Sequence, residues 1–111
     1  MIKSAKNIKK AIRKKAEKKM RDRLIERIEN IEDSKYIFVC NDDMNFEGSN
    51  NLLLKLKRKG YLIEPAERSY KDITGLETEY GVIISYLSHD ELPDYIKEEI
   101  KAGREAIGKE K

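Results

Sequence analysis

The spacing of the apolar residues in the first third of the chain constrains the fold more than any other feature. Between residues 5 and 31 they recur every three or four positions, which is typical of one apolar stripe along a helix. The stripe consists of Ala5, Ile8, Ile12, Ala16, Met20, Leu24, Ile28 and Ile31. It predicts a single helix over residues 2–32, roughly thirty residues and about 45 Å long. The stripe becomes bulkier at Met20, so we expect the second half to pack on the rest of the protein and the first half to project or to meet a partner.

Charge is divided unevenly along the chain. Residues 1–21, which we call the basic arm, hold ten Lys or Arg and a single acid, Glu17. The basic arm therefore carries +9, the remaining residues carry −6, and the whole chain carries +3. A mixed surface would be enough for solubility, so this segregation suggests that the basic arm meets an anionic partner.

The composition of the basic arm favours contact with phosphates over reading of bases. Its lysines outnumber its arginines eight to two, and Lys acts as a point charge, whereas Arg suits bidentate recognition of bases. No aromatic residue lies between Met1 and Lys35, so the arm has no stacking surface for single strands. We therefore predict nucleic-acid binding without sequence preference. The predicted binding residues are Lys3, Lys6, Lys9, Lys10, Arg13, Lys14, Lys15, Lys18, Lys19 and Arg21.

Three other interpretations of the basic arm stay open. A basic amphipathic helix can dock in an acidic groove of a protein, which is the main alternative. It can also lie on an anionic membrane, although the absence of Trp and Phe from the arm argues against that partner. Finally, the lysines can simply keep a solvated helix soluble.

The remainder of the chain predicts a small α+β domain. Strands are predicted over residues 36–41, 61–64 and 80–86, and helices over residues 51–59 and 91–102. The first two strands and the helix between them match a right-handed βαβ unit with parallel strands. The second and third strands match a long hairpin with its tip at residues 69–78. The order is α-β-α-β-β-α, which predicts a three-stranded mixed sheet with packed helices and with open edges at which another chain can pair.

These elements divide the chain into three segments. A basic amphipathic helix is predicted over residues 1–33 and the α+β domain over residues 34–102. A flexible tail is predicted over residues 103–111, because Gly103 and Gly108 weaken a helix.

The α+β domain offers few residues with catalytic or metal-binding character. Asp43, Asn45 and Glu47 match the first half of a calcium loop, but Leu54 stands where a bidentate Glu is needed. A looser divalent site at Asp42 and Asp43 is less favoured than an ordinary turn. Ser88, His89 and Asp90 fit a helix start better than a triad, so we predict no enzyme, no cofactor and no metal. Tyr70 with Arg68 and Lys71 at the hairpin tip is a possible partner contact.

Cysteine content and hydropathy bear on the location of the protein. Cys40 is the single cysteine, so no disulfide can form within the chain, and a reducing intracellular location is predicted. The N-terminal segment lacks the apolar region of a signal peptide, and no apolar run approaches the length of a membrane span.

Two segments carry a family resemblance. Lys59-Gly60-Tyr61-Leu62-Ile63 and, after a polar hairpin, Tyr80-Gly81-Val82-Ile83-Ile84-Ser85-Tyr86 resemble a pattern in small uncharacterised phage and prophage proteins. The resemblance spans about residues 36–87 and consists of fold-forming residues. It implies a small viral protein, either a virion component or an early protein that acts on a host target, located in the host cytoplasm or the virion. The basic arm is not part of this pattern.

Overall fold

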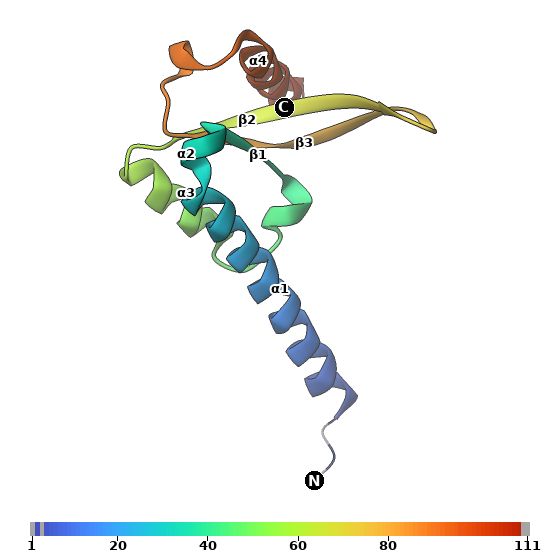
Figure 1. Ribbon diagram of the computed structural model, residues 1–111. Coiled ribbons are helices and arrows are strands. Elements are labelled where there is room, and N and C mark those ends of the chain that lie inside the picture. Colours follow the sequence, from blue (N-terminus) through green and yellow to red (C-terminus); the bar gives the residue numbers. More distant parts are fainter. Residues whose placement is uncertain (1, 3, 110–111) are drawn as a thin grey trace.

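A computed structural model describes residue 2 and residues 4–109. A three-stranded antiparallel sheet separates two groups of helices (Figure 1). Helices α1 (Ala5–Glu29), α2 (Ile31–Ser34) and α3 (Ser49–Arg58) lie on one side of the sheet, and α4 (Asp94–Lys109) lies on the other. Two short 3₁₀ turns, η1 (Asn41–Met44) and η2 (His89–Glu91), complete the described elements. The predicted α+β class is confirmed.

The first helix ends earlier than predicted. Ser4 caps its start, because the Ser4 hydroxyl accepts a hydrogen bond of 3.2 Å from the amide of Asn7. At its end the Asn30 side chain donates to the carbonyl of Glu26 at 2.9 Å, which competes with the helical ladder. The chain then forms the short α2 and reverses at Lys35, whose φ is 69°. The predicted single helix over residues 2–32 is therefore wrong at both ends.

The sheet has the strand order β1-β3-β2, with β1 (Tyr36–Cys40), β2 (Leu62–Asp72) and β3 (Gly75–Ser85). β3 is antiparallel to both neighbours, so the predicted mixed sheet is wrong. β1 and β2 do run in the same direction, but β3 lies between them. The reason is the continuous apolar run in β3, which demands burial on both faces. Ile83 and Ile84 are fully buried, and they belong to the two opposite cores.

The hairpin formed by β2 and β3 is longer and tighter than predicted. Asp72 pairs with Gly75, so residues 69–72 and 75–78 continue the strands where a loose tip was predicted. Pro65 does not end the second strand but lies inside β2, where an edge position tolerates its missing amide hydrogen. β1 ends at Cys40, opposite Gly81, and the hairpin extends beyond it (Figure 1). We call residues 67–80 the projecting hairpin.

The last helix continues past its predicted end at Ala102. Residues 103–109 continue the helix where a flexible tail was predicted, and residues 110 and 111 lie outside the described part. Gly103 is buried against β2, where a Cβ atom would lie 2.5 Å from the Cα of Ala66. The glycine therefore allows a close crossing of α4 over the sheet instead of ending the helix.

Candidate nucleic-acid interface

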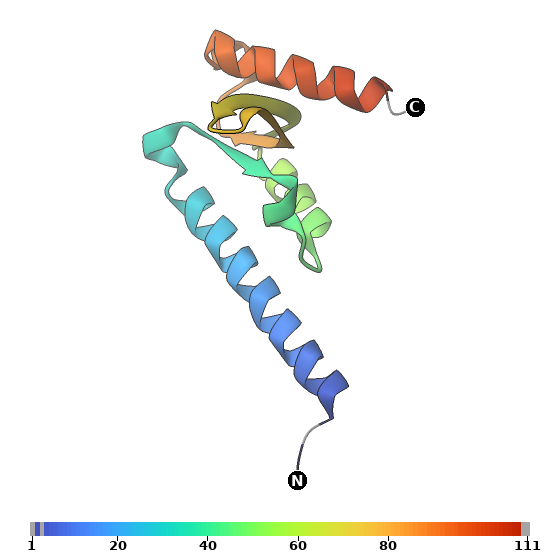
Figure 2. The ribbon, with the colours of Figure 1, turned by 90° about the vertical axis from the view of Figure 1, so that its right-hand side faces the viewer.

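The apolar stripe of α1 winds around the helix and leaves the protein body. From Ile8 to Ile28 each step is four residues, and each step of four advances by about 40° around an α-helix. Over five such steps the stripe turns by about 200°. Leu24 and Ile28 are accordingly buried against the sheet, whereas Ile8 and Ile12 are 46% and 62% exposed. The first half of α1 thus projects from the body without an apolar face directed at it (Figures 1 and 2).

The described bases of the basic arm are all solvent-exposed. They comprise Lys6, Lys9, Lys10, Arg13, Lys14, Lys15, Lys18, Lys19 and Arg21. Lys3, the remaining predicted residue, lies outside the described part of the chain. Within the described residues, Arg21 is the one member with an ion pair, a 4.0 Å contact to the exposed Asp22. Apart from Arg21, the described bases of the arm therefore present a high density of positive charge without an ion pair to a described carboxylate.

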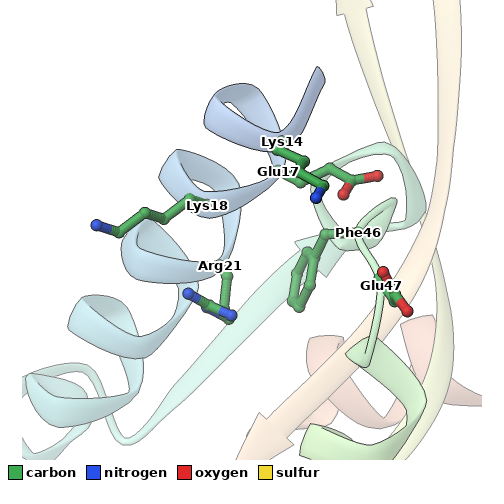
Figure 3. A pocket seen from close by; sticks show the side chains of 6 residues that line it. All are labelled: Lys14, Glu17, Lys18, Arg21, Phe46 and Glu47. Atoms are coloured by element: carbon green, nitrogen blue, oxygen red, sulfur yellow. The ribbon is translucent and has the colours of Figure 1, made fainter. Parts of the chain in front are cut away.

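The loop after β1 marks the point where the basic arm leaves the body. Phe46 is buried in the core beneath α1, and a hollow beside it is lined by Lys14, Glu17, Lys18, Arg21 and Glu47. Lys14 and Glu17 point toward this loop, whereas Lys18 and Arg21 point away from it (Figure 3). The single acid of the basic arm therefore lies on the side of the body, and Lys18 and Arg21 leave the outer side basic.

A second contact holds α1 along the outer edge of β1. The guanidinium of Arg27 donates a 2.7 Å hydrogen bond to the carbonyl of Phe38. This bond uses an edge carbonyl that could otherwise pair with an incoming strand. The edge of β3 beyond β1, at residues 75–80, has no such cover from β1.

The predicted partner contact at the hairpin does not form one cluster. The Arg68 guanidinium makes two 3.0 Å hydrogen bonds to the Glu99 carboxylate and lies 4.5 Å from the ring centroid of Phe38. Tyr70 is exposed on the same face of β2, whereas strand alternation places Lys71 on the opposite face. Arg68 is thus engaged within the molecule, and Tyr70 and Lys71 look in opposite directions.

The structure reveals an anionic face that was not predicted from the sequence. Strand register places Glu77 opposite Tyr70 and Glu79 opposite Arg68, with Asp72 two residues further along β2. The Tyr70 hydroxyl donates a 3.2 Å hydrogen bond to Glu79. This bond and the negative charges of Glu79, Glu77 and Asp72 raise the pKa of Tyr70. The signal in the sequence was the alternation of Glu77 and Glu79, but its meaning depended on knowing the exact turn.

The remaining candidate groups are dispersed. Asp42 and Asp43 are exposed in η1, and no group of three His, Cys, Asp or Glu among the described residues is placed to hold a metal ion. His89 is at the surface beside Asp90. Glu91 accepts hydrogen bonds from the backbone amide and hydroxyl of Ser88, and these bonds lower the pKa of Glu91. Ser88 thus begins the 3₁₀ turn η2 with a capping box, whereas the last helix, whose start was predicted at this segment, begins only at Asp94.

Among the described residues, no helix has the length and apolar character needed to cross a membrane. No protein-family model matches the sequence, and no curated protein or solved structure is significantly similar to it.

Proposed function

We propose that this protein is a non-enzymatic nucleic-acid binder whose basic arm contacts phosphates without sequence preference. One observation carries the proposal: the described bases of the arm are exposed around a projecting helix, and all but Arg21 lack an ion pair within the described residues. Phosphate neutralisation requires side chains of this type at this density.

The body supports this function by fixing the orientation of the arm. Leu24 and Ile28 anchor the second half of α1 in the core, and Arg27 ties it to β1. The remaining residues of the chain have a net charge of −6 and repel phosphates. A polyanion is therefore attracted to the arm and kept away from the body, so that the arm is the whole interface.

A salt titration tests the proposal. Binding of the full chain to a mixed-sequence DNA duplex longer than the arm is measured by fluorescence anisotropy between about 50 and 200 mM salt. We expect the logarithm of the binding constant to fall linearly with the logarithm of the salt concentration, with a slope of about −0.9 for each phosphate contact. Absence of binding at about 50 mM salt would refute the proposal.

Matched variants separate the basic arm from general positive charge. Replacing Lys6, Lys10 and Lys14 by Gln should weaken binding and reduce the steepness of the salt dependence by up to about 3. Replacing Lys55, Lys57 and Lys59 by Gln removes the same charge from the exposed surface of α3 and its end. This control should leave the slope nearly unchanged. Equal effects of the two triple variants would contradict an interface confined to the arm.

The alternative is a protein-interaction module that docks through the basic helix or an open sheet edge, such as an inhibitor of a host factor or an assembly component. The exposure of Ile8 and Ile12 favours it, because phosphates offer no contact for these side chains. Replacing both by Gln should abolish binding to an acidic protein groove but leave DNA binding unchanged. A partner retained after nuclease treatment would support the alternative, and loss of the partner would support the nucleic-acid function.

The place of this function in a viral setting is part of the proposal. It rests on the residue pattern over residues 36–87 that resembles small phage and prophage proteins. We accordingly propose an accessory or virion protein that acts in the host cytoplasm or within the virion.

A further inference from the structure

The projecting hairpin carries a compact anionic face on the side of the sheet that α4 covers. Tyr70, Asp72, Glu77 and Glu79 form this face, because they share the strand alternation of Ala66, which is buried in the core beneath α4. The face lies beyond the contact between α4 and Arg68. Three carboxylates thus share one face with Tyr70, a residue that is 43% exposed.

The negative charge of the anionic face is not neutralised within the described part of the chain. Asp72 accepts hydrogen bonds from the amide and hydroxyl of Thr74 at 2.7 and 2.6 Å, and Glu79 accepts one from Tyr70. No described Lys or Arg forms an ion pair with these carboxylates, and Arg68 is taken by Glu99. The hydrogen bond to Glu79, together with the charges of Glu79, Glu77 and Asp72, raises the pKa of Tyr70.

The basic arm of the same molecule does not reach this face. The second half of α1 packs in the core on the opposite side of the sheet, with Ile37, Val39 and Ile84. The first half continues away from the projecting hairpin (Figure 1), and Figure 2, which shows the hairpin nearly end-on, places α1 below it. One molecule therefore holds a cationic surface on its projecting arm and an anionic surface on its hairpin, and no ion pair joins the two within the described residues.

We propose that the basic arm of one copy docks on the anionic face of a second copy. Ile12 would pack beside the Tyr70 ring, because both are exposed apolar groups within charged surroundings. Lys9 and Lys15 lie three residues before and after Ile12, about 60° to either side of it on the helix, and would reach the flanking carboxylates. The described arm up to Lys19 is about 22 Å long, enough to cross a two-stranded ribbon.

This contact joins the basic arm of one copy to the anionic face of another. The first copy therefore keeps a free anionic face, and the second copy keeps a free arm. Repetition of the contact produces a ring or an open chain of copies. If the arm also binds nucleic acid, as the proposed function states, a polyanion and the hairpin of a neighbouring copy compete for the same arm. The association itself does not depend on that function.

Sedimentation velocity of the nucleic-acid-free full chain tests the association. At low salt we expect the weight-average sedimentation coefficient to rise with protein concentration, and at high salt to return to the monomer value, because the attraction is screened. Glu77→Gln with Glu79→Gln should abolish the rise. Glu98→Gln with Glu105→Gln, the same charge change on exposed carboxylates of α4, is the matched control and should retain it.

Charge reversal gives the sharper test. Lys9→Glu with Lys15→Glu should be monomeric at low salt, and so should Glu77→Lys with Glu79→Lys. An equimolar mixture of these two variants should associate again, because each reversed surface now meets its complement. A monomeric wild type at low salt, equal effects of the two Gln pairs, or a mixture that stays monomeric would overturn the proposal.

DNA binding measured alongside separates this inference from the proposed function. Glu77→Gln with Glu79→Gln should bind DNA at least as tightly as the wild type, since it removes a competitor and leaves the arm intact. A wild type that binds DNA but stays monomeric at low salt would refute the inference alone. Self-association without DNA binding would refute the proposed function alone.

Discussion

Two glycines of α4 have opposite roles at the scale of single residues. Gly103 faces Ala66 at a distance that excludes a side chain, whereas a Cβ at Gly108 would meet nothing within 4 Å. Gly103→Ala should therefore lower the free energy of unfolding by about 1–3 kcal/mol through overpacking. Gly108→Ala should raise it by up to about 1 kcal/mol, because Ala is the better helix former. Urea denaturation measures both, and similar effects of the two would contradict the close crossing of α4 and β2.

The Arg68–Glu99 pair should matter more than the second ion pair between α4 and β2. The Arg68 and Glu99 side chains are 35% and 19% exposed, and Arg68 also covers the ring of Phe38. Arg68→Met should destabilise the fold by about 2 kcal/mol, because it leaves a half-buried carboxylate without its donors. Arg104→Met also leaves a carboxylate without its partner, since the Glu64 side chain is 22% exposed, but it should cost less than about 1 kcal/mol because the Arg104 side chain is 54% exposed and water can replace it.

A second substitution checks the origin of the Arg68 effect. Replacing both Arg68 and Glu99 by Met should recover much of the loss measured by urea denaturation, because no unpaired charge remains buried. A double variant as unstable as Arg68→Met alone would show that lost packing on Phe38, and not the unpaired carboxylate, dominates.

The tyrosine of the anionic face should titrate anomalously. Its hydrogen bond to Glu79 and the nearby carboxylates raise the pKa of Tyr70 above its ordinary value. The folded state thus holds the phenolic proton more tightly than the unfolded chain does. Its contribution to stability is complete below the ordinary Tyr pKa and is lost as the pH rises through the folded value. NMR of tyrosine labelled at Cζ should show the pKa falling toward the ordinary value in Glu79→Gln, but not in Glu105→Gln.

Residue identity predicted the cationic surface but not the anionic one. Nine lysines and arginines of the basic arm remain exposed because they crowd one helix, whatever its exact rotation. Asp72 shares a face with Glu77 and Glu79 because the turn has two residues, 73 and 74, and pairs Asp72 with Gly75. A turn one residue longer would pair Asp72 with Leu76 and move both glutamates to the opposite face, so composition alone could not reveal the cluster.

At the scale of elements, α1 is one continuous helix with two unlike halves. The repeated spacing of four turns its apolar stripe away from the body, so that Ile12 and Leu24 belong to the same pattern but not to the same surface. Leu24→Ala should lower the free energy of unfolding by about 2–5 kcal/mol. Ile12→Gln should change it by less than about 0.5 kcal/mol. Comparable losses in urea denaturation would place the first half of α1 against the body.

The sheet shows how much of a strand arrangement can be predicted from the order of helices and strands along the chain. The hairpin of the second and third strands was predictable, because two strands separated by a turn usually pair. The position of the third strand was not, because a βαβ unit permits either direct pairing or insertion of a later strand. Burial decided the outcome: only the central place gives Ile83 and Ile84 a full core on each side.

At the scale of the whole molecule, the boundary between positive and negative charge coincides with the boundary between the projecting arm and the compact body. The net-negative remainder contains the sheet, both cores and the anionic face, and the net-positive arm projects from it. In water this arrangement makes the arm a ligand for any polyanion, while the body contributes orientation and repulsion. The proposed DNA binding and the proposed self-association therefore use the same surface, and both require that the arm stays extended.

The extended arm predicts an unusually large radius of gyration. The structure has a value of 16.7 Å, whereas a compact domain of this length has about 13 Å. Small-angle X-ray scattering at high salt, where electrostatic association is screened, should give a value close to that of the structure. Deletion of residues 2–15 should bring it toward the compact value without loss of the folded core, because the residues of α1 that pack in the core begin at Met20. A wild-type value near 13 Å would mean that the arm folds back onto the acidic body in solution, and the free cationic surface on which both proposals depend would not exist.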